Sequence, residues 1–208
     1  MNKVNSKISF FSNIQNIIKE NIKILTSFII CIVVIIAGYQ FYSFNKNKNI
    51  RELSVFYFDT KKSESQSEFI ENMNVISKDK SFYGLMASLE IINFKIENKN
   101  YNDSFNEYMN LLNNKNLDNI YKTLIAIHAS YNLFNKIDSN NIINLLSYVD
   151  ISLESFVGYR LEILYLLSLT QGDVNKTNSL YEEIINNEQV SSSIKERVMK
   201  INGFEKYK

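Results

Sequence analysis

Few side chains in this sequence have the types and spacing that chemistry requires. His128 is the only histidine, and no cysteine or second histidine stands near it. A general base needs a nucleophile or an orienting group within hydrogen-bond reach, and the sequence offers none for this residue. Glu182 and Glu183 are adjacent, so on a helix their carboxylates point to different faces. The sequence therefore predicts no catalytic residues and a protein that is not an enzyme.

Sites for metals, cofactors and nucleic acids are not predicted either. The chain has no Gly-rich phosphate loop and no spacing of His, Glu or Cys residues suited to zinc or calcium. Its 23 basic and 22 acidic residues nearly balance, and it lacks the basic stripe that is typical of nucleic-acid binding. We expect no cofactor, no metal, no small-molecule substrate and no nucleic-acid partner.

The longest uncharged run extends from Ile24 to Asn45 and is flanked by Lys23 and Lys46. A helix of about 20 apolar residues crosses the hydrocarbon core of a bilayer, and in lipid its backbone groups must bond within the segment. A cleaved signal peptide has a shorter apolar region of about 7–15 residues close to the amino terminus, whereas 23 residues precede this run. We therefore predict an uncleaved transmembrane helix over residues 24–45.

The basic residues on either side of this run give little guidance on its orientation. Four lysines precede it, and Lys46, Lys48 and Arg51 follow it closely. Because basic residues are enriched on the cytoplasmic side of a span, the count slightly favours a cytoplasmic amino-terminal tail. The predicted organisation is a tail over residues 1–23, the span over 24–45, a juxtamembrane helix or linker over 46–62 and a helical domain over 63–208.

The domain after the span is predicted to be all-α. Pro is absent and five Gly occur, so the turn residues that a β-sandwich or barrel needs are scarce. Apolar residues instead recur at helical spacing. The predicted helices cover residues 69–76, 82–96, 105–112, 120–134, 140–149, 153–170, 175–186 and 191–204. The apolar stripe predicted for the 120–134 helix is Ile120, Leu124, Ile127, Tyr131 and Phe134.

Three joints between these helices share a local pattern. They are Lys99–Asn100–Tyr101, Asn135–Lys136–Ile137 and Gly172–Asp173–Val174, and their last residues lie 36 and 37 residues apart. A tetratricopeptide unit is about 34 residues long. One helical hairpin cannot bury its apolar face alone, so hairpins stack and share a continuous core. The spacing predicts an α-solenoid of helical hairpins.

Three parts of the chain carry a resemblance to a known family. They are the anchor followed by Phe56–Tyr57–Phe58, the segment YGLMASLEIINFKIENKNYNDSFNEY at 83–108, and the segment GYRLEILYLLSLTQGDVNKTNSLYEEI at 158–184. On these parts the chain resembles the membrane-anchored tetratricopeptide-like family that includes the ancillary subunit of the SecYEG translocon. The resemblance implies a short cytoplasmic tail, one transmembrane helix and a periplasmic tetratricopeptide-like α-solenoid.

The chain departs from the consensus of that repeat in two respects. The small residue of the second helix in each hairpin is Ser104 in one hairpin and Thr177 in another, where Ala is expected. The consensus Trp and Pro are missing as well, since the sequence contains neither residue. The sequence therefore resembles a divergent member of the family, and the fold transfers more readily than the function.

The same resemblance predicts that the first helix of each hairpin lines a concave groove. Counting back from the three joints places six residues there: Asn93, Glu97, Lys122, Asn132, Tyr159 and Glu162. Polar side chains mixed with a Tyr suit the binding of peptides or loops, although such positions can also be ordinary solvated ones. The predicted function is a bacterial inner-membrane interaction module, an accessory or chaperone-like subunit near the Sec translocon that contacts translocon subunits or client polypeptides. The alternative is a structural scaffold in cell-envelope assembly or division.

Overall fold

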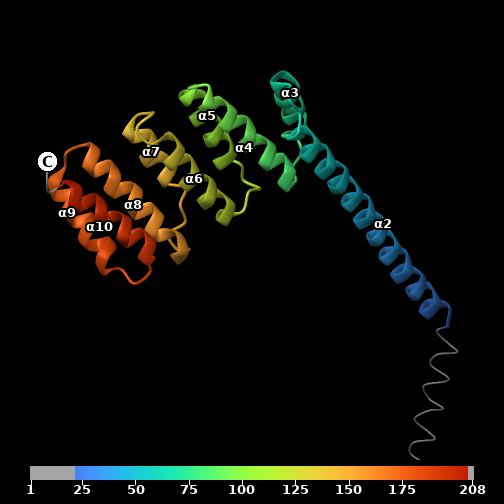
Figure 1. Ribbon diagram of the computed structural model, residues 1–208. Helices are drawn as coiled ribbons and strands as arrows, with labels where there is room; N and C mark the ends of the chain where they lie inside the picture. The colour runs from blue at the N-terminus through green and yellow to red at the C-terminus, as the bar shows by residue number, and fades with distance from the viewer. Residues whose placement is uncertain (1–21, 206–208) are drawn as a thin grey trace, which may run out of the picture. The chain divides into compact units, whose positions relative to one another are not determined.

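The computed structural model describes the backbone of residues 22–205 and the side chains of residues 31–204. The described part of the chain forms two compact units, which divide between residues 87 and 88. Across the described residues, the regular secondary structure is helical throughout (Figure 1). The prediction of an all-α chain is confirmed for this part, and the arrangement is compatible with an α-solenoid.

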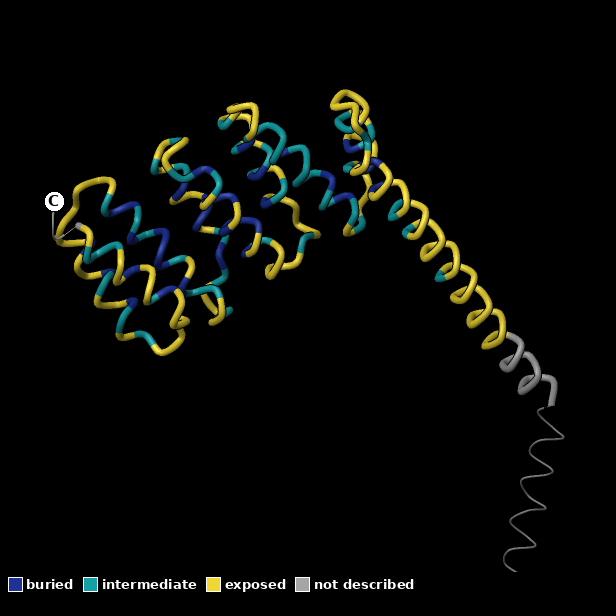
Figure 2. Tube along the Cα trace, in the orientation of Figure 1, coloured by how far each residue is buried: buried dark blue, intermediate teal, exposed yellow. Residues whose placement is uncertain are grey.

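The first unit is built on one long helix, α2 (Ile22–Thr60), against which α3 (Gln66–Ile76) packs. α2 runs without a break across the predicted boundary at residue 45, and its one glycine, Gly38, does not interrupt it. Most of its described side chains are exposed (Figure 2). The predicted tail lies almost wholly in residues 1–21, outside the described residues.

The predicted transmembrane helix falls within α2. Over the residues that the structure describes, none of the helices combines the length and the apolar character that a membrane crossing requires. Residues 24–30, the first part of the predicted span, lie outside the residues whose side chains are described.

A capped turn joins α2 to α3. The backbone N–H of Glu68 donates to Ser65 Oγ at 3.4 Å, and Ser63 Oγ donates to Glu68 Oε2 at 2.8 Å. A serine oxygen that accepts from the third residue of a helix replaces a bond that the first turn lacks. The turn therefore reverses the chain, so that α3 returns along α2 and buries Met73 and Ile76.

The second unit contains the end of α4 and the helices that follow it. The bounds are Phe82–Glu97 for α4, Tyr101–Leu112 for α5, Asn119–Leu133 for α6, Ser139–Leu146 for α7, Glu154–Thr170 for α8, Val174–Asn186 for α9 and Ser192–Glu205 for α10. α5 packs on α6, α6 on α7 and on α8, and α8 on α9 and α10. Every helix predicted from residue 69 onward is present, and α7 ends three residues before the predicted position.

Each of the three predicted joints contains one residue with a positive φ. The angle is 61° at Lys99, 57° at Asn135 and 69° at Gly172. Residues other than Gly and Asn seldom adopt this left-handed region, because the Cβ atom approaches the backbone too closely. The repeat of 36 and 37 residues is therefore also a repeat of backbone conformation.

Two of these joints have the hydrogen bonds of a Schellman motif. At the end of α4, the Asn100 N–H donates to the Lys95 carbonyl at 2.8 Å, and the Lys99 N–H donates to the Ile96 carbonyl at 2.9 Å. The same pair of bonds, each 3.1 Å long, closes the end of α8 around Gly172. In both places carbonyls that the helix end would leave unpaired are satisfied, and the next helix starts at once.

The middle joint has a different geometry. Phe134 has φ −55° and ψ 131°, Asn135 follows at positive φ, and the Lys136 N–H donates to the Leu133 carbonyl at 2.9 Å. This is a type II turn, which accepts Asn in its third position. The helix after it, α7, starts later, at Ser139. As a consequence Asn140 is exposed, although the corresponding residues of the other hairpins, Ser104 and Thr177, are buried.

Buried side chains of the second unit gather between helices of successive hairpins. One core joins α8, α9 and α10 through Leu161, Tyr165, Leu180, Ile184, Val190, Ile194 and Val198. α5, α6 and α7 contribute Tyr108, Leu112, Ala126, Ala129, Leu133, Ile142 and Leu145, which are all fully buried. Figure 2 shows the buried parts of these helices in dark blue.

The apolar stripe predicted for α6 is wrong in most of its members. Ile120, Leu124 and Tyr131 are exposed by 43%, 44% and 37%, while Ala126 and Ala129 are fully buried. Small side chains at a contact let neighbouring helices approach closely. The helix therefore packs through Ala126 and Ala129 together with large residues such as Leu133, and it leaves Ile120, Leu124 and Tyr131 on the open side.

Opposite exchanges at two joints should change stability in opposite directions. Lys99→Gly removes a side chain from the left-handed region and should raise the free energy of unfolding by about 0.5–1 kcal/mol. Gly172→Lys introduces that strain and should lower it by about 1 kcal/mol. Urea unfolding of the full chain in mild detergent, followed by circular dichroism, measures both. Lys115→Gly, in a loop without positive φ, is the control, and a gain there as large as at Lys99 would contradict the explanation.

Candidate interaction surface

A buried carboxylate lies where α6, α8 and α10 meet. Glu162 of α8 is only 3% exposed. Arg197 of α10 donates through Nε to Glu162 Oε1 at 2.8 Å and through Nη2 to Oε2 at 2.6 Å. Tyr131 of α6 donates its hydroxyl to Oε2 at 2.6 Å. A buried carboxylate is costly unless it is paired and hydrogen-bonded, and in this Tyr–Glu–Arg cluster two other helices supply the donors.

The Tyr–Glu–Arg cluster holds its donors in one protonation state. The hydrogen bond to Glu162 raises the pKa of the Arg197 guanidinium above its usual range. Burial, together with the Glu162 carboxylate, raises the pKa of the Tyr131 hydroxyl well above its usual value. Both groups keep their protons at physiological pH, so the cluster is suited to holding helices together rather than to transferring protons.

A second polar cluster joins α5 to α6. Tyr108 Oη lies 3.0 Å from His128 Nδ1 and accepts a hydrogen bond from Asn132 Nδ2 at 3.4 Å. Burial raises the pKa of Tyr108 and lowers the pKa of His128. The histidine is therefore neutral at pH 7. Its neighbours are a phenol and an amide, which position the ring without making it a base for a nucleophile.

The six residues predicted to line a groove differ widely in their surroundings. Asn132 and Glu162 belong to the two separate clusters just described. Of the other four, Asn93 and Lys122 are half-buried, and Glu97 and Tyr159 are exposed. Lys122 also stands nine residues before Tyr131, which places it half a turn away around α6. The structure thus brings Glu162 to Tyr131 but leaves Lys122 on another side of the helix.

An apolar face of α6 lies next to the Tyr–Glu–Arg cluster. Ile120, Leu124 and Tyr131 are spaced i, i+4 and i+11, so they share one side of the helix. Because Tyr131 reaches Glu162, this side lies beside the α8 face that carries Glu162 and, three residues earlier, Tyr159. Tyr159 is 37% exposed. We refer to Ile120, Leu124, Tyr131 and Tyr159 as the α6–α8 surface.

Arg197 is the residue of this site that local sequence patterns missed. It lies 35 residues from Glu162, beyond the reach of a helical periodicity. One signal was available, because Glu162 interrupts the strongly apolar helix 153–170. A Glu in such a position is almost never buried without a partner. Arg197, one of only three arginines in the chain, provides the planar pair of donors that fits a carboxylate.

The described residues contain no group of three or more His, Cys, Asp or Glu side chains placed to hold a metal ion. Comparison of the chain with protein-family models, with curated proteins and with solved structures found no match. The function of the α6–α8 surface is therefore inferred from its own geometry and chemistry.

Removing one member of the buried ion pair should cost more than removing both. Arg197→Met leaves the Glu162 carboxylate buried without a cation, and we expect the free energy of unfolding to fall by about 2–4 kcal/mol. Adding Glu162→Leu should recover more than half of that loss. Urea unfolding of the single and double variants gives the comparison, with Arg160→Met on α8 as a control expected to change stability by about 0.5 kcal/mol or less. If the double variant loses as much free energy of unfolding as the two single variants together, the pair is not coupled.

Stability should fall slightly as the pH drops below neutrality. The pKa of His128 in the folded chain is lower than the ordinary value of 6.5, so the unfolded chain binds the proton more tightly. Stability is therefore lost as pH falls through about 6.5 towards the folded pKa. Because the ring is partly open to solvent, the effect should be small. Since His128 is the only histidine, His128→Gln should flatten the dependence of melting temperature on pH between 7.5 and 5.5, and an unchanged slope would exclude this assignment.

Proposed function

We propose that this chain is a single-pass inner-membrane protein whose helical-repeat unit binds a polypeptide. The anchor would be the uncharged run at 24–45. It lies within one continuous helix, α2. Large apolar side chains in the described part of the run are open to solvent, with Ile35 70% and Phe44 68% exposed. Such exposure favours a lipid or protein environment over water.

The observation that carries the binding function is the α6–α8 surface. It presents two aliphatic and two tyrosine side chains, each 37–44% exposed, on helices that the Tyr–Glu–Arg cluster holds in place. Apolar and aromatic residues on a rigid support bind extended or helical peptides well. Arg197, with 48% of its side chain exposed, adds a partly accessible polar group at the edge. A polypeptide partner with an apolar segment fits this chemistry.

The partner class we favour is a client polypeptide or a subunit of the Sec translocon, reached from the periplasm. A tether raises the local concentration of weak partners, so modest affinity suffices. The second candidate is a scaffold in envelope assembly or division, in which copies of the chain associate with each other. It is favoured by the length of exposed apolar helix on α2, which could pair with a second copy.

A charge placed on the α6–α8 surface should disrupt partner capture without unfolding the chain. Leu124→Glu changes a side chain that is 44% exposed, and Ile143→Glu on α7 changes one that is 42% exposed. Both should leave stability nearly unchanged. With a photo-crosslinker at Tyr159 in living cells, we expect Leu124→Glu to reduce the crosslinked partner roughly fivefold or more, and Ile143→Glu to leave it unchanged.

The identity of the crosslinked species separates the two candidate functions. Translocon subunits or newly secreted chains support the accessory role, whereas envelope proteins or a second copy of this chain support the scaffold. If Leu124→Glu and Ile143→Glu give equal amounts of crosslinked partner, the α6–α8 surface is ruled out as the binding site. A reporter fused after Lys208 tests topology, because a cytoplasmic location of that end would exclude both periplasmic functions.

A further inference from the structure

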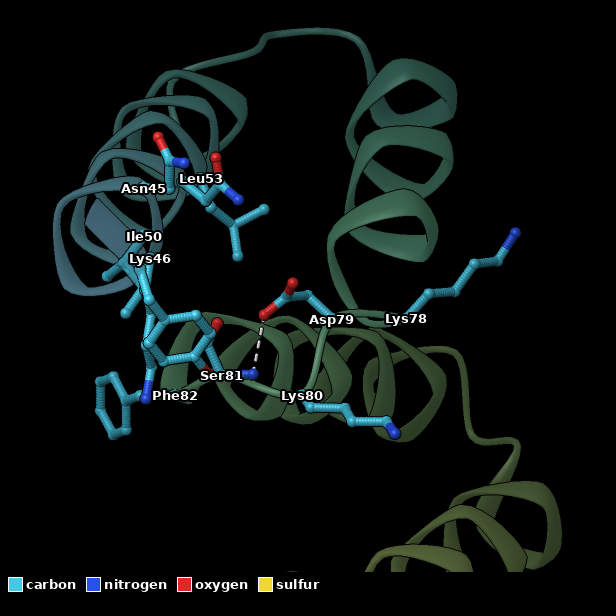
Figure 3. A pocket seen from close by; sticks show the side chains of 11 residues that line it. Asn45, Lys46, Ile50, Leu53, Lys78, Asp79, Lys80, Ser81 and Phe82 are labelled. Carbon is cyan, nitrogen blue, oxygen red and sulfur yellow. Dashed lines mark hydrogen bonds between the residues drawn. The ribbon is translucent and has the colours of Figure 1, made fainter. Parts of the chain in front are cut away.

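The cavity of the first unit selects no ligand. It has a volume of about 740 Å³ and lies between α2 and the loop that joins α3 to α4 (Figure 3). Figure 3 shows that the side chains of Lys78 and Lys80 extend away from it. Lys46 and Asp79, which also line it, carry opposite charges and leave no net charge to attract an ion. The α6–α8 surface, in contrast, adjoins a donor group that the structure holds in place.

That donor group is the guanidinium of Arg197. Its Nε and Nη2 atoms both donate to the buried Glu162 carboxylate, and two bonds to one carboxylate fix the plane of the guanidinium. Neither bond uses Nη1, which the planar group places on the other side of Cζ from the carboxylate. We call this side the open edge of Arg197. Because 48% of the side chain is exposed, the open edge can reach a partner, and little side-chain freedom is lost when it binds.

The open edge lies at one end of the α6–α8 surface. Arg197 and Tyr131 both donate to Oε2 of Glu162, so the guanidinium lies next to the Tyr131 hydroxyl. From there the α6 part of the surface continues back to Leu124 and Ile120. At 1.5 Å per residue, Ile120 and Tyr131 are about 16 Å apart along the helix. About five extended residues of a partner would span that distance.

The charge balance at Arg197 favours a neutral acceptor. The Glu162 carboxylate already neutralises the guanidinium, so a second anion would gain little from it. The neutral acceptor that every polypeptide carries is the backbone carbonyl. In a helix each carbonyl is bonded to the N–H four residues further on, whereas an extended segment leaves its carbonyls open to outside donors. The open edge therefore favours an extended segment over a helical one.

The apolar residues of the surface fit the same conformation. Ile120 and Leu124 are about 6 Å apart along α6. In an extended chain, alternate side chains point to the same side and repeat about every 6.6 Å. Two apolar side chains separated by one residue can therefore contact Ile120 and Leu124 together, while Tyr131 and Tyr159 offer aromatic contacts at the end next to Arg197.

We propose that the α6–α8 surface binds an extended polypeptide segment with alternating apolar residues, and that Arg197 donates to a backbone carbonyl of that segment. This inference rests on the proposed function, because it specifies the partner of the same surface. It restricts the partner to a chain that has an unfolded segment when it binds. A client polypeptide that has not yet folded meets this condition, and a folded helical partner does not.

Fluorescence anisotropy of labelled peptides, with the full chain in mild detergent, tests the proposal. The probe is a short uncharged peptide in which Leu alternates with Ser, and a second peptide of the same composition has its Leu residues at helical spacing. Glu162→Leu/Arg197→Met removes the donor without leaving a buried charge, and Arg160→Met, outside the α6–α8 surface, is the matched control. We expect the Kd for the alternating peptide to rise roughly tenfold in the double variant, as for the loss of one hydrogen bond from a charged donor. The control should bind it as the wild type does, and the wild type should bind the helical-spacing peptide more weakly.

Arg197→Lys provides a second variant that does not depend on the folding of the double variant. Lysine keeps a cation next to Glu162 but lacks the planar set of donors, so we expect weaker binding of the alternating peptide here as well. Circular dichroism shows which variants are folded. Unchanged binding by either folded variant would overturn the contact with Arg197.

The outcomes separate this contact from the surface itself. If Leu124→Glu abolishes binding of the alternating peptide while Glu162→Leu/Arg197→Met leaves it unchanged, the surface stands and the Arg197 contact is excluded. If Leu124→Glu leaves binding unchanged, the surface and the contact fail together. Equal binding of the two peptides by the wild type would overturn the extended conformation. Much tighter binding after one Asp is added to the alternating peptide would show a site for a carboxylate and would also overturn the proposal.

Discussion

The buried charge of Glu162 constrains the second unit more than any other single group. A carboxylate removed from water needs both a cation and a full set of hydrogen bonds. Here the donors are Tyr131 and Arg197, which lie 31 and 35 residues from Glu162 in the sequence. α6, α8 and α10 must therefore dock together, because each alone would leave the charge or its donors unsatisfied. This coupling crosses the boundary between successive hairpins. It also fixes the exposed face of α6 beside Tyr159, so the α6–α8 surface depends on the same contact that stabilises the stack.

The joints between helices show how different residues can serve one geometry. Lys99, Asn135 and Gly172 share a left-handed conformation, although only glycine adopts it without a Cβ penalty. At Lys99 and Gly172 the same two backbone hydrogen bonds close the preceding helix, so the fold tolerates lysine at some cost in stability. At Asn135 the turn is of another type, and the start of the following helix moves with it. The three joints thus recur at regular positions and share a positive φ, while their hydrogen bonds and residue types differ.

Local patterns predicted the helices well and the contacts between them less well. The absence of Pro and the helical spacing of apolar residues located the helices from residue 69 onward, and the three joints followed from a short recurring motif. The apolar stripe of α6 was wrong in most of its members, because it was chosen by hydrophobic size and so omitted Ala126 and Ala129, which the structure buries, although its member Ile127 is buried. The pairing of Glu162 with Arg197 depends on tertiary structure, since residues 35 apart on different helices have no periodic relation. Both errors concern the same question of which helix lies next to which, and single-helix patterns contain no answer to it.

The uninterrupted helix α2 has a further consequence. From Asn45 to Thr60 it rises roughly 22 Å at 1.5 Å per residue, and the described helix contains no Pro or second Gly at which it could bend. The segment is therefore a stiff spacer that sets how far the turn into α3 stands from the end of the uncharged run. Because each residue also turns the helix by about 100°, the number of residues in the spacer determines direction as well as height. Natural variation in this segment should then favour insertions and deletions close to whole helical turns, even where the amino acids themselves are free to change.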